Sequence, residues 1–298
     1  MPFRRSYARS TRYRRRTTRR VPRRVTRRVI TRRRPTRNRY NSRRRILNVA
    51  SKKKQDNMAP LVTATNGSGG VPGPYGYSAF GSTTSVQTGM FVWCATARDR
   101  INTGDDPTSV ATRNSDTCYM RGLKETVLIQ TNSAVPWRWR RICFTIKGLY
   151  NFRAGSADSV ENSNGWQRIL TDQRPTAYGA SIREIIFRGV QGIDWNDTMT
   201  AKLDSTRVTV RYDVTRTINS GNATGVLRTY KMWHPMNKNL VYGNDESGDS
   251  ETQDIHSTLG KAGMGDFYVL DFFQAAQFAQ SGDTLLFNPE ATLYWHEK

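Results

Sequence analysis

Hydrophobic and polar residues alternate along several short segments of this 298-residue chain. In residues 207–216, RVTVRYDVTR, apolar or aromatic side chains occupy every second position, and polar or charged side chains occupy the positions between them. Residues 142–146, ICFTI, show the same alternation. A period of two places one set of side chains on each face of an extended chain, which predicts strands with one buried face.

Such β-rich stretches recur from residue 90 to residue 295, and polar loops separate them. We predict eight strands, at residues 90–97, 119–131, 136–147, 182–190, 207–216, 226–234, 267–273 and, last, 284–287 with 291–295. Short helical segments are expected at residues 165–172 and 274–280. Long loops between strands favour Greek-key connections, so we predict an all-β fold, an eight-stranded antiparallel jelly-roll sandwich. An immunoglobulin-like sandwich has the same alternation, and the pattern alone does not separate the two.

The composition divides the chain into three parts. Residues 1–54 are strongly basic, and residues 55–88 are rich in Gly, Pro, Ser and Thr, with no charge after Asp56. Pro and Gly of this density are typical of linkers. We therefore predict a basic arm at residues 1–54, a linker at 55–88 and the jelly-roll domain at 89–298.

The arm carries almost the whole net charge of +23. It holds 21 Arg and 3 Lys with no acidic residue, which leaves 47 − 24 = 23 basic and 24 acidic residues, a net charge of −1, in residues 55–298. A segment with this self-repulsion and so few apolar groups is expected to be disordered on its own, and its natural partner is a polyanion. Arg favours phosphate in particular, because the guanidinium makes bidentate contacts and stacks on bases.

We predict that the arm binds nucleic acid through these residues: Arg4, Arg5, Arg12, Arg14, Arg15, Arg16, Arg19, Arg20, Arg23, Arg24, Arg27, Arg28, Arg32, Arg33, Arg34, Arg43, Arg44 and Arg45. Two basic clusters joined by a short spacer also predict a nuclear import signal, which the cellular import machinery would bind; they are Arg43, Arg44 and Arg45 with Lys52, Lys53 and Lys54. An arm that serves only solubility or import would need far fewer charges.

The sequence contains no constellation that indicates catalysis or a cofactor. Cys94, Cys118 and Cys143 are odd in number and lack the C-x-x-C spacing of zinc sites, so buried thiols are expected. The three histidines stand far apart, which argues against a metal site. The acidic residues 243–254 do not match a calcium-loop pattern and predict an exposed loop. We predict neither an enzyme nor a small-molecule substrate, cofactor or metal.

No run of about 18 apolar residues is present, so we expect no membrane partner.

One segment of the body concentrates aromatic and cationic residues: Trp137, Arg138, Trp139, Arg140 and Arg141. On a strand, both Trp share a face with Arg141, while Arg138 and Arg140 share the other. One hypothesis is a nucleic-acid platform of stacking rings and phosphate-binding cations. The alternative is that the Trp side chains anchor the core while the Arg side chains face solvent or a neighbouring subunit.

The Arg-rich arm, the segment VPWRWRRICFTIKG at 135–148 and the C-terminal strand ATLYWHEK together resemble capsid proteins of the genomoviruses, a group of small circular single-stranded DNA viruses related to geminiviruses. The resemblance implies a jelly-roll subunit, about sixty copies of itself in an icosahedral (T=1) shell, and an arm that binds a single-stranded DNA genome. It further implies that the protein occurs in the virion and in the host cell nucleus.

Two other classes of protein compete with this interpretation. A ribosomal or chromatin-type protein that binds RNA or DNA has a similar basic extension, and so does a nucleic-acid enzyme with a basic anchor. Cellular binders usually spread positive charge over the folded domain, whereas residues 55–298 are nearly neutral. The charge distribution therefore favours a body that contacts copies of itself.

Overall fold

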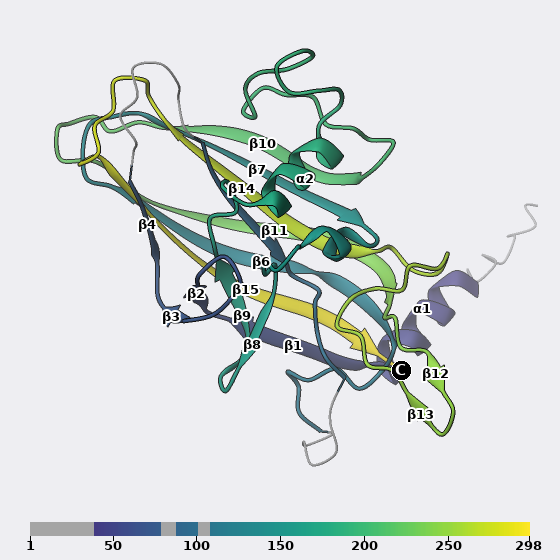
Figure 1. The fold of residues 1–298 in the computed structure, drawn as a ribbon. Coiled ribbons are helices and arrows are strands. Elements are labelled where there is room, and N and C mark those ends of the chain that lie inside the picture. Colours follow the sequence, from purple (N-terminus) through teal and green to yellow (C-terminus); the bar gives the residue numbers. More distant parts are fainter. Residues whose placement is uncertain (1–38, 79–87, 101–107) are drawn as a thin grey trace, which may run out of the picture. The chain divides into compact units, whose positions relative to one another are not determined.

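A computed structural model describes residues 39–78, 88–100 and 108–298 (Figure 1). The described residues of 46–298 form one compact unit, and residues 39–45 fall outside it. Of the predicted arm, the described part is helix α1 (Arg39–Ala50) and the residues that follow it. Arg4 through Arg34, and the disorder predicted for them, lie outside the described residues. Among the helices described, none is long and apolar enough to cross a membrane.

Two antiparallel sheets build the larger unit. The first has the strand order β1-β15-β6-β11, with β4 also paired to β15. The second has the order β10-β7-β14-β5. Their strands are β1 (Lys52–Met58), β4 (Tyr75–Ser78), β5 (Thr88–Cys94), β6 (Thr117–Thr131), β7 (Trp137–Ile146), β10 (Thr209–Ile218), β11 (Leu227–Val241), β14 (Asp266–Ala275) and β15 (Thr284–Glu297).

The strand order is that of a jelly roll. Taken along the chain, β1, β6, β11 and β15 belong to one sheet and β5, β7, β10 and β14 to the other, so that most successive strands change sheets. The first strand, β1, lies beside the last, β15, and each sheet mixes strands from both halves of the chain. Two four-stranded antiparallel sheets connected in this way form the double Greek key of a jelly roll, which confirms the predicted fold class.

Smaller elements lie around this sandwich. They are β2 (Pro60–Val62), β3 (Val71–Pro72), the 3-10 helix η1 (Leu149–Phe152), β8 (Val160–Asn162), β9 (Gly165–Leu170), α2 (Ala177–Ile186), β12 (Glu246–Ser247) and β13 (Ser250–Glu251). β2, β3, β8 and β9 make a further small sheet. The acidic residues 243–254 are largely exposed and contain the β12-β13 hairpin, as expected for a surface loop.

Three of the local predictions are wrong. Of residues 182–190, predicted as a strand, the first five belong to helix α2, which ends at Ile186. Thr176 caps the N-terminus of this helix by accepting a hydrogen bond from the backbone N–H of Gly179. Tyr178, Ile182 and Ile186 recur every four residues on its buried side. Residues 165–170 form strand β9 instead of a helical turn, and residues 276–280 form no helix.

The predicted boundaries of the arm and the linker are also corrected. Residues 52–58 are an edge strand, paired along their whole length with the C-terminal strand, and further strands occupy residues 60–62, 71–72 and 75–78. Strand β1 has the sequence KKKQDNM, and only its Lys54 and Met58 side chains are buried. An edge strand with two buried side chains needs few apolar residues, so its sequence does not stand out as a strand. Lys54 is buried with Glu297, which offsets its charge, so a strand forms where composition indicated a flexible segment.

Buried side chains form three clusters. Two of them lie between the sheets and include Trp93, Trp139 and Trp295. The third joins the other face of β5, β7 and β14 to helix α2 and to residues 187–208. The β10-β7-β14-β5 sheet is therefore covered on both faces over its central strands, while the β1-β15-β6-β11 sheet is covered on one.

Candidate nucleic-acid interface

Residues 137–141, which we call the Trp–Arg segment, begin strand β7, one of the two central strands of the doubly covered sheet. Trp137 and Trp139 are 0% and 1% exposed and belong to the cluster between the sheets. Arg141 is also buried on that side, at 1% exposed, and Arg138 and Arg140 project to the opposite side. The predicted division of the five side chains between two faces is confirmed, but neither face of β7 is a free surface.

Arg141 is held by two buried carboxylates. Its Nε and one terminal nitrogen donate to the two oxygens of Asp271 at 2.7 and 2.9 Å, and the other terminal nitrogen donates to Glu125 at 2.7 Å. Trp139 donates from its indole nitrogen to the same Asp271 at 2.7 Å. Asp271 lies on β14 beside β7, whereas Glu125 lies on β6 of the other sheet. These hydrogen bonds therefore join the two sheets through their interior.

A second arginine balances the charge of this cluster. Arg168 on β9 donates to Asp271 at 3.0 Å and to Glu125 at 3.4 Å, and its guanidinium lies 4.5 Å from the ring centre of Trp93. Two cations thus face two anions in a region from which water is excluded. Burial alone would raise the pKa of Asp271, but the charge and hydrogen bonds of Arg141 lower it below its ordinary value.

His234 borders the same cluster without adding charge. Its Nε2 lies 3.7 Å from Glu125, and its Nδ1 lies 3.8 Å from the sulfur of Cys143. Burial lowers the pKa of His234 to about 4, although Glu125 acts in the opposite direction. The imidazole is therefore neutral near pH 7.

On the other side of β7, the remaining two arginines are also paired within the chain. Arg140 makes a bidentate contact with Asp213 at 2.8 Å and donates to the backbone oxygens of Thr198 and Ala201. Arg138 donates to Asp197 at 2.7 Å, and its side chain is 41% exposed.

These contacts correct the prediction that the Trp–Arg segment contacts nucleic acid or a neighbouring subunit. Four of the five side chains are buried inside one chain: Trp137, Trp139, Arg140 and Arg141. The polar groups of Trp139, Arg140 and Arg141 are hydrogen-bonded to partners in that chain. The alternative that Trp anchors the core holds for both Trp side chains. For Arg138, which keeps an exposed portion, contact with nucleic acid stays a prediction.

The predicted import clusters fall in two different elements. Residues 43–45 lie within helix α1, where the side chain of Arg45 is exposed. Lys52 and Lys53 are exposed at the start of β1, but Lys54 points inward and contacts Glu297, Thr112 and Asn114. Lys54 is therefore corrected from an import residue to a structural one, since its ammonium group has no access to a receptor.

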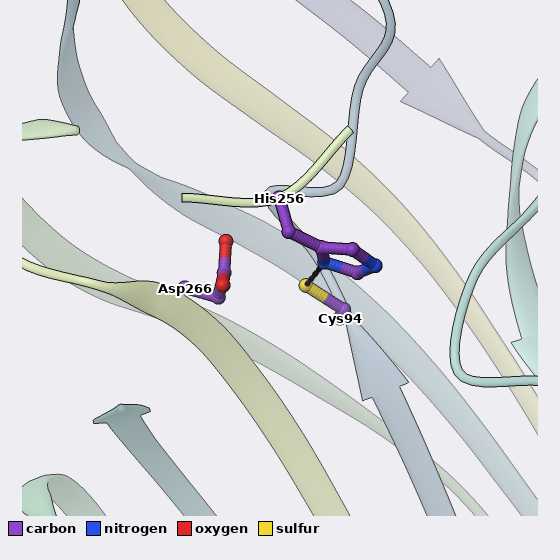
Figure 2. A group of neighbouring side chains, drawn as sticks. All are labelled: Cys94, His256 and Asp266. Atoms are coloured by element: carbon purple, nitrogen blue, oxygen red, sulfur yellow. Dashed lines mark hydrogen bonds between the residues drawn. The ribbon is translucent and has the colours of Figure 1, made fainter. Parts of the chain in front are cut away.

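Another buried polar group has a donor set that zinc accepts. Cys94, His256 and Asp266 come from β5, the loop after β13 and the start of β14, and their ligand atoms all lie within 4.8 Å of one another (Figure 2). The Cys94 sulfur lies 4.0 Å from His256 Nδ1, the contact drawn as a dashed line. Thiolate, imidazole and carboxylate are all zinc ligands.

The hydrogen bonds of this group favour a structural role. Both oxygens of Asp266 accept hydrogen bonds from Ser257, one from its backbone N–H at 2.8 Å and one from its hydroxyl at 2.9 Å. Burial raises the pKa of the Cys94 thiol well above its ordinary value, and it raises the pKa of Asp266 to about 7. The group thus fixes residues 255–257 against β14, and the absence of a bound metal stays a prediction.

Sequence reasoning missed the partners of the Trp–Arg segment, namely Glu125, Asp271 and Arg168. A signal was present, because Asp271 interrupts the apolar run FYVLDFF and Glu125 interrupts a predicted strand. A charge inside a buried strand requires an opposite charge nearby. The pattern does not say which of the many arginines supplies it.

Comparison with known proteins adds little to this geometry. No protein-family model matches the chain, and no curated protein matches it. Among solved structures, the VP1 protein of Trichodysplasia spinulosa-associated polyomavirus aligns with 83% of this chain and 94% of its own, at 10% sequence identity and a TM-score of 0.12. Similarity at that level carries no argument, so the assignment of the jelly roll rests on the strand order of the chain itself.

Proposed function

We propose that this protein is the capsid subunit of a small virus and that copies of it form a closed shell around single-stranded DNA. The observation that carries the proposal is the combination of an eight-stranded jelly roll with an N-terminal segment that holds 24 of the 47 basic residues. Jelly rolls occur in viral capsids and also in lectins and cupins. The separation of charge supports the first of these, because a nearly neutral domain can pack against copies of itself while the basic segment binds a polyanion.

The arginine content supports nucleic acid as the cargo. Guanidinium groups bind phosphate bidentately and stack on bases, so a chain rich in Arg is better suited to a nucleic acid than to a lipid surface. The resemblance to genomovirus capsid proteins favours single-stranded DNA. With the 21 arginines of residues 1–51, about sixty copies would carry 60 × 21 = 1260 positive charges, which suits a strand on the order of 1500 to 2500 nucleotides once small cations are included.

We also propose that the basic N-terminal segment directs the protein to the host cell nucleus, where such a genome would be packaged. Residues 43–45 together with Lys52 and Lys53 are the candidate signal. A fusion of residues 1–60 to a fluorescent protein is expected to accumulate in nuclei. Replacing residues 43–45 by Gln should abolish the accumulation, and a fusion that stays cytoplasmic without any replacement would refute this part of the proposal.

Size and nucleic-acid content of the purified intact protein test the main proposal. Particles in the megadalton range that protect DNA of the stated length from nuclease are the expected result. A monomer that binds RNA or DNA without forming particles would instead favour a ribosomal or chromatin-type binding protein. A monomer with neither property would leave no support for packaging at all.

A further inference from the structure

The exposed face of the β1-β15-β6-β11 sheet is a second surface that suits nucleic acid. Its burial alternates along β6 and β15, so every second side chain turns away from the core. We call this surface the open face. Its basic and aromatic side chains come from all four strands and are Lys53, Tyr119, Arg121, Lys124, Lys231, Trp233, Tyr294 and His296.

Trp233 lies on β11, the edge strand of the sheet, and its side chain reaches over the neighbouring strand β6. It is 48% exposed, and a Cβ atom on Gly122 of the neighbouring strand would come within 2.6 Å of its ring. A residue with a side chain at position 122 would thus lift the indole from the sheet. Glycine at position 122 therefore leaves the space that the indole occupies over β6. The ring of Tyr294 lies 5.8 Å away, on β15.

A second pair of rings lies further along the same strands. Tyr119 is 37% exposed, and its ring centre is 6.2 Å from that of His296. Tyr294 and His296 are two residues apart on β15, which separates the two pairs by about 7 Å along the strand direction. Aromatic rings exposed in sequence along a sheet are the platform on which proteins stack successive unpaired bases.

The charge of the open face is positive and uncompensated. Four basic side chains turn outward from these strands: Lys53, Arg121, Lys124 and Lys231. Glu290 is the one acidic side chain of these strands that turns outward, so the net charge of the open face is 4 − 1 = +3. None of the four forms an ion pair with another described residue, in contrast to the arginines of β7. Burial, Arg121 and Lys53 together lower the pKa of His296, which reflects the same positive field.

We propose that the open face binds single-stranded nucleic acid, with bases stacked on Trp233 and Tyr119 and phosphates beside Lys124, Lys231 and Lys53. The choice of single-stranded DNA as the natural ligand rests on the proposed function, whereas the preference for an unpaired strand follows from the exposed rings. A second copy of the chain is a poor occupant of the same face, since two faces of charge +3 would meet.

Binding of a labelled oligothymidylate to the intact protein tests the proposal. Because the N-terminal segment binds phosphates, the comparison is made at high salt, where phosphate contacts weaken and stacking persists. Trp233→Ala should weaken binding roughly ten-fold, and Trp233→Phe should recover most of the loss. Phe278→Ala is the matched control, because Phe278 is a 68% exposed aromatic side chain in a loop outside the open face.

The cations are tested separately, in case Trp233→Ala disturbs the fold. The double variant Lys124→Gln/Lys231→Gln should reduce the slope of log affinity against log salt by about two, while Lys202→Gln, an exposed lysine between α2 and β10, should change it by at most about one. Ultraviolet cross-linking of an iodouracil-substituted strand should place a cross-link on Trp233 or Tyr119.

Two results would overturn the inference while leaving the proposed function intact. One is unchanged binding in both the aromatic and the lysine variants. The other is that these variants no longer form particles while their separate subunits bind the oligonucleotide as well as the parent does, which would make the open face a contact between copies of the chain. If the unaltered protein bound no oligonucleotide at any salt concentration, the proposed function itself would fail.

Discussion

The two sheets of the jelly roll differ in what lies against them, and the difference decides what their charged residues do. In the β10-β7-β14-β5 sheet, β7 and β14 are buried along almost their whole length on both faces. In the β1-β15-β6-β11 sheet, β6 and β15 bury alternate residues only. The arginines of β7 are therefore paired with carboxylates within the chain, whereas lysine and arginine on the open face of the second sheet remain available to a partner.

Composition alone would assign these roles the other way round. The densest aromatic and cationic stretch of the body, residues 137–141, is in the covered sheet and stabilises the fold. The basic and aromatic residues of the open face are spread over four strands between residues 53 and 296 and form no motif. Sequence density thus marks the buried charge cluster, while register between distant strands assembles the exposed one.

The largest expected effect is in the covered interior. Arg141→Met removes one of the two cations that balance Asp271 and Glu125, and leaving a buried carboxylate without its partner costs about 3–5 kcal/mol. Urea unfolding of the intact, nucleic-acid-free protein would measure this loss. Lys124→Met is the control, next to Glu125 on the exposed side of the same strand, and should change stability by no more than about 0.5 kcal/mol. Equal losses in the two variants would contradict the contrast between the sheets.

A second effect concerns pH. The buried Asp266 has a pKa raised to about 7, against an ordinary value of 3.8. Between these values the unfolded chain has lost the proton that the folded chain retains, so this group makes stability fall as pH rises from about 4 to about 7, by up to about 1.4 kcal/mol per pH unit. Outside that window it contributes no slope, because both states are protonated below it and both are ionised above it.

Asp266→Asn cannot ionise and should remove this contribution. The difference in unfolding free energy between variant and parent isolates it from His234, whose pKa lowered to about 4 acts in the opposite direction between about pH 4 and 6.5. Glu290→Gln, which removes an exposed carboxylate of the open face, is the matched control variant. A parallel pair of curves for Asp266→Asn and the parent would rule out the effect.

A smaller loss of stability is expected at Lys54, which was predicted to belong to the basic arm. Lys54→Met leaves Glu297 with its hydrogen bonds from Asn114, Cys118 and Trp295 but without a cation, and the expected loss is about 1–3 kcal/mol. The exposed Lys52 is the matched control, and Lys52→Met should be close to neutral. If Lys54→Met left the melting temperature unchanged but reduced nuclear import, residue 54 would belong to the arm after all.

The smallest effect is at the partly exposed end of the Trp–Arg segment. Arg138→Gln removes an ion pair with Asp197 whose members are 41% and 33% exposed, so the loss should stay below about 1 kcal/mol. Arg140→Gln, two residues further along β7, should lower stability more, because it also leaves the buried backbone oxygens of Thr198 and Ala201 without their hydrogen-bond donor. Thermal unfolding of the two variants side by side ranks them, and the reverse order would refute the assignment of burial.

The sequence by itself determined that the fold is all-β and located most of the strands, whereas the strand order that makes it a jelly roll came from the tertiary structure. Period-two alternation is a local property, because it follows from the geometry of one extended chain, and it located β7 and β10 from their own residues. Short β-rich runs located β5, β6, β11, β14 and β15 in the same local way. The charge division between residues 1–54 and 55–298 is likewise a matter of counting.

The tertiary structure decided what each face contacts. β1 is a strand because it pairs with β15, which lies more than 230 residues away in the sequence. Residues 182–186 are helical because their apolar side chains, together with Tyr178, pack against the outer face of the β10-β7-β14-β5 sheet. Arg141 is structural because Asp271, 130 residues distant, lies beside it in register. Pairing between remote segments fixes which charges are buried together, and no local pattern contains that information.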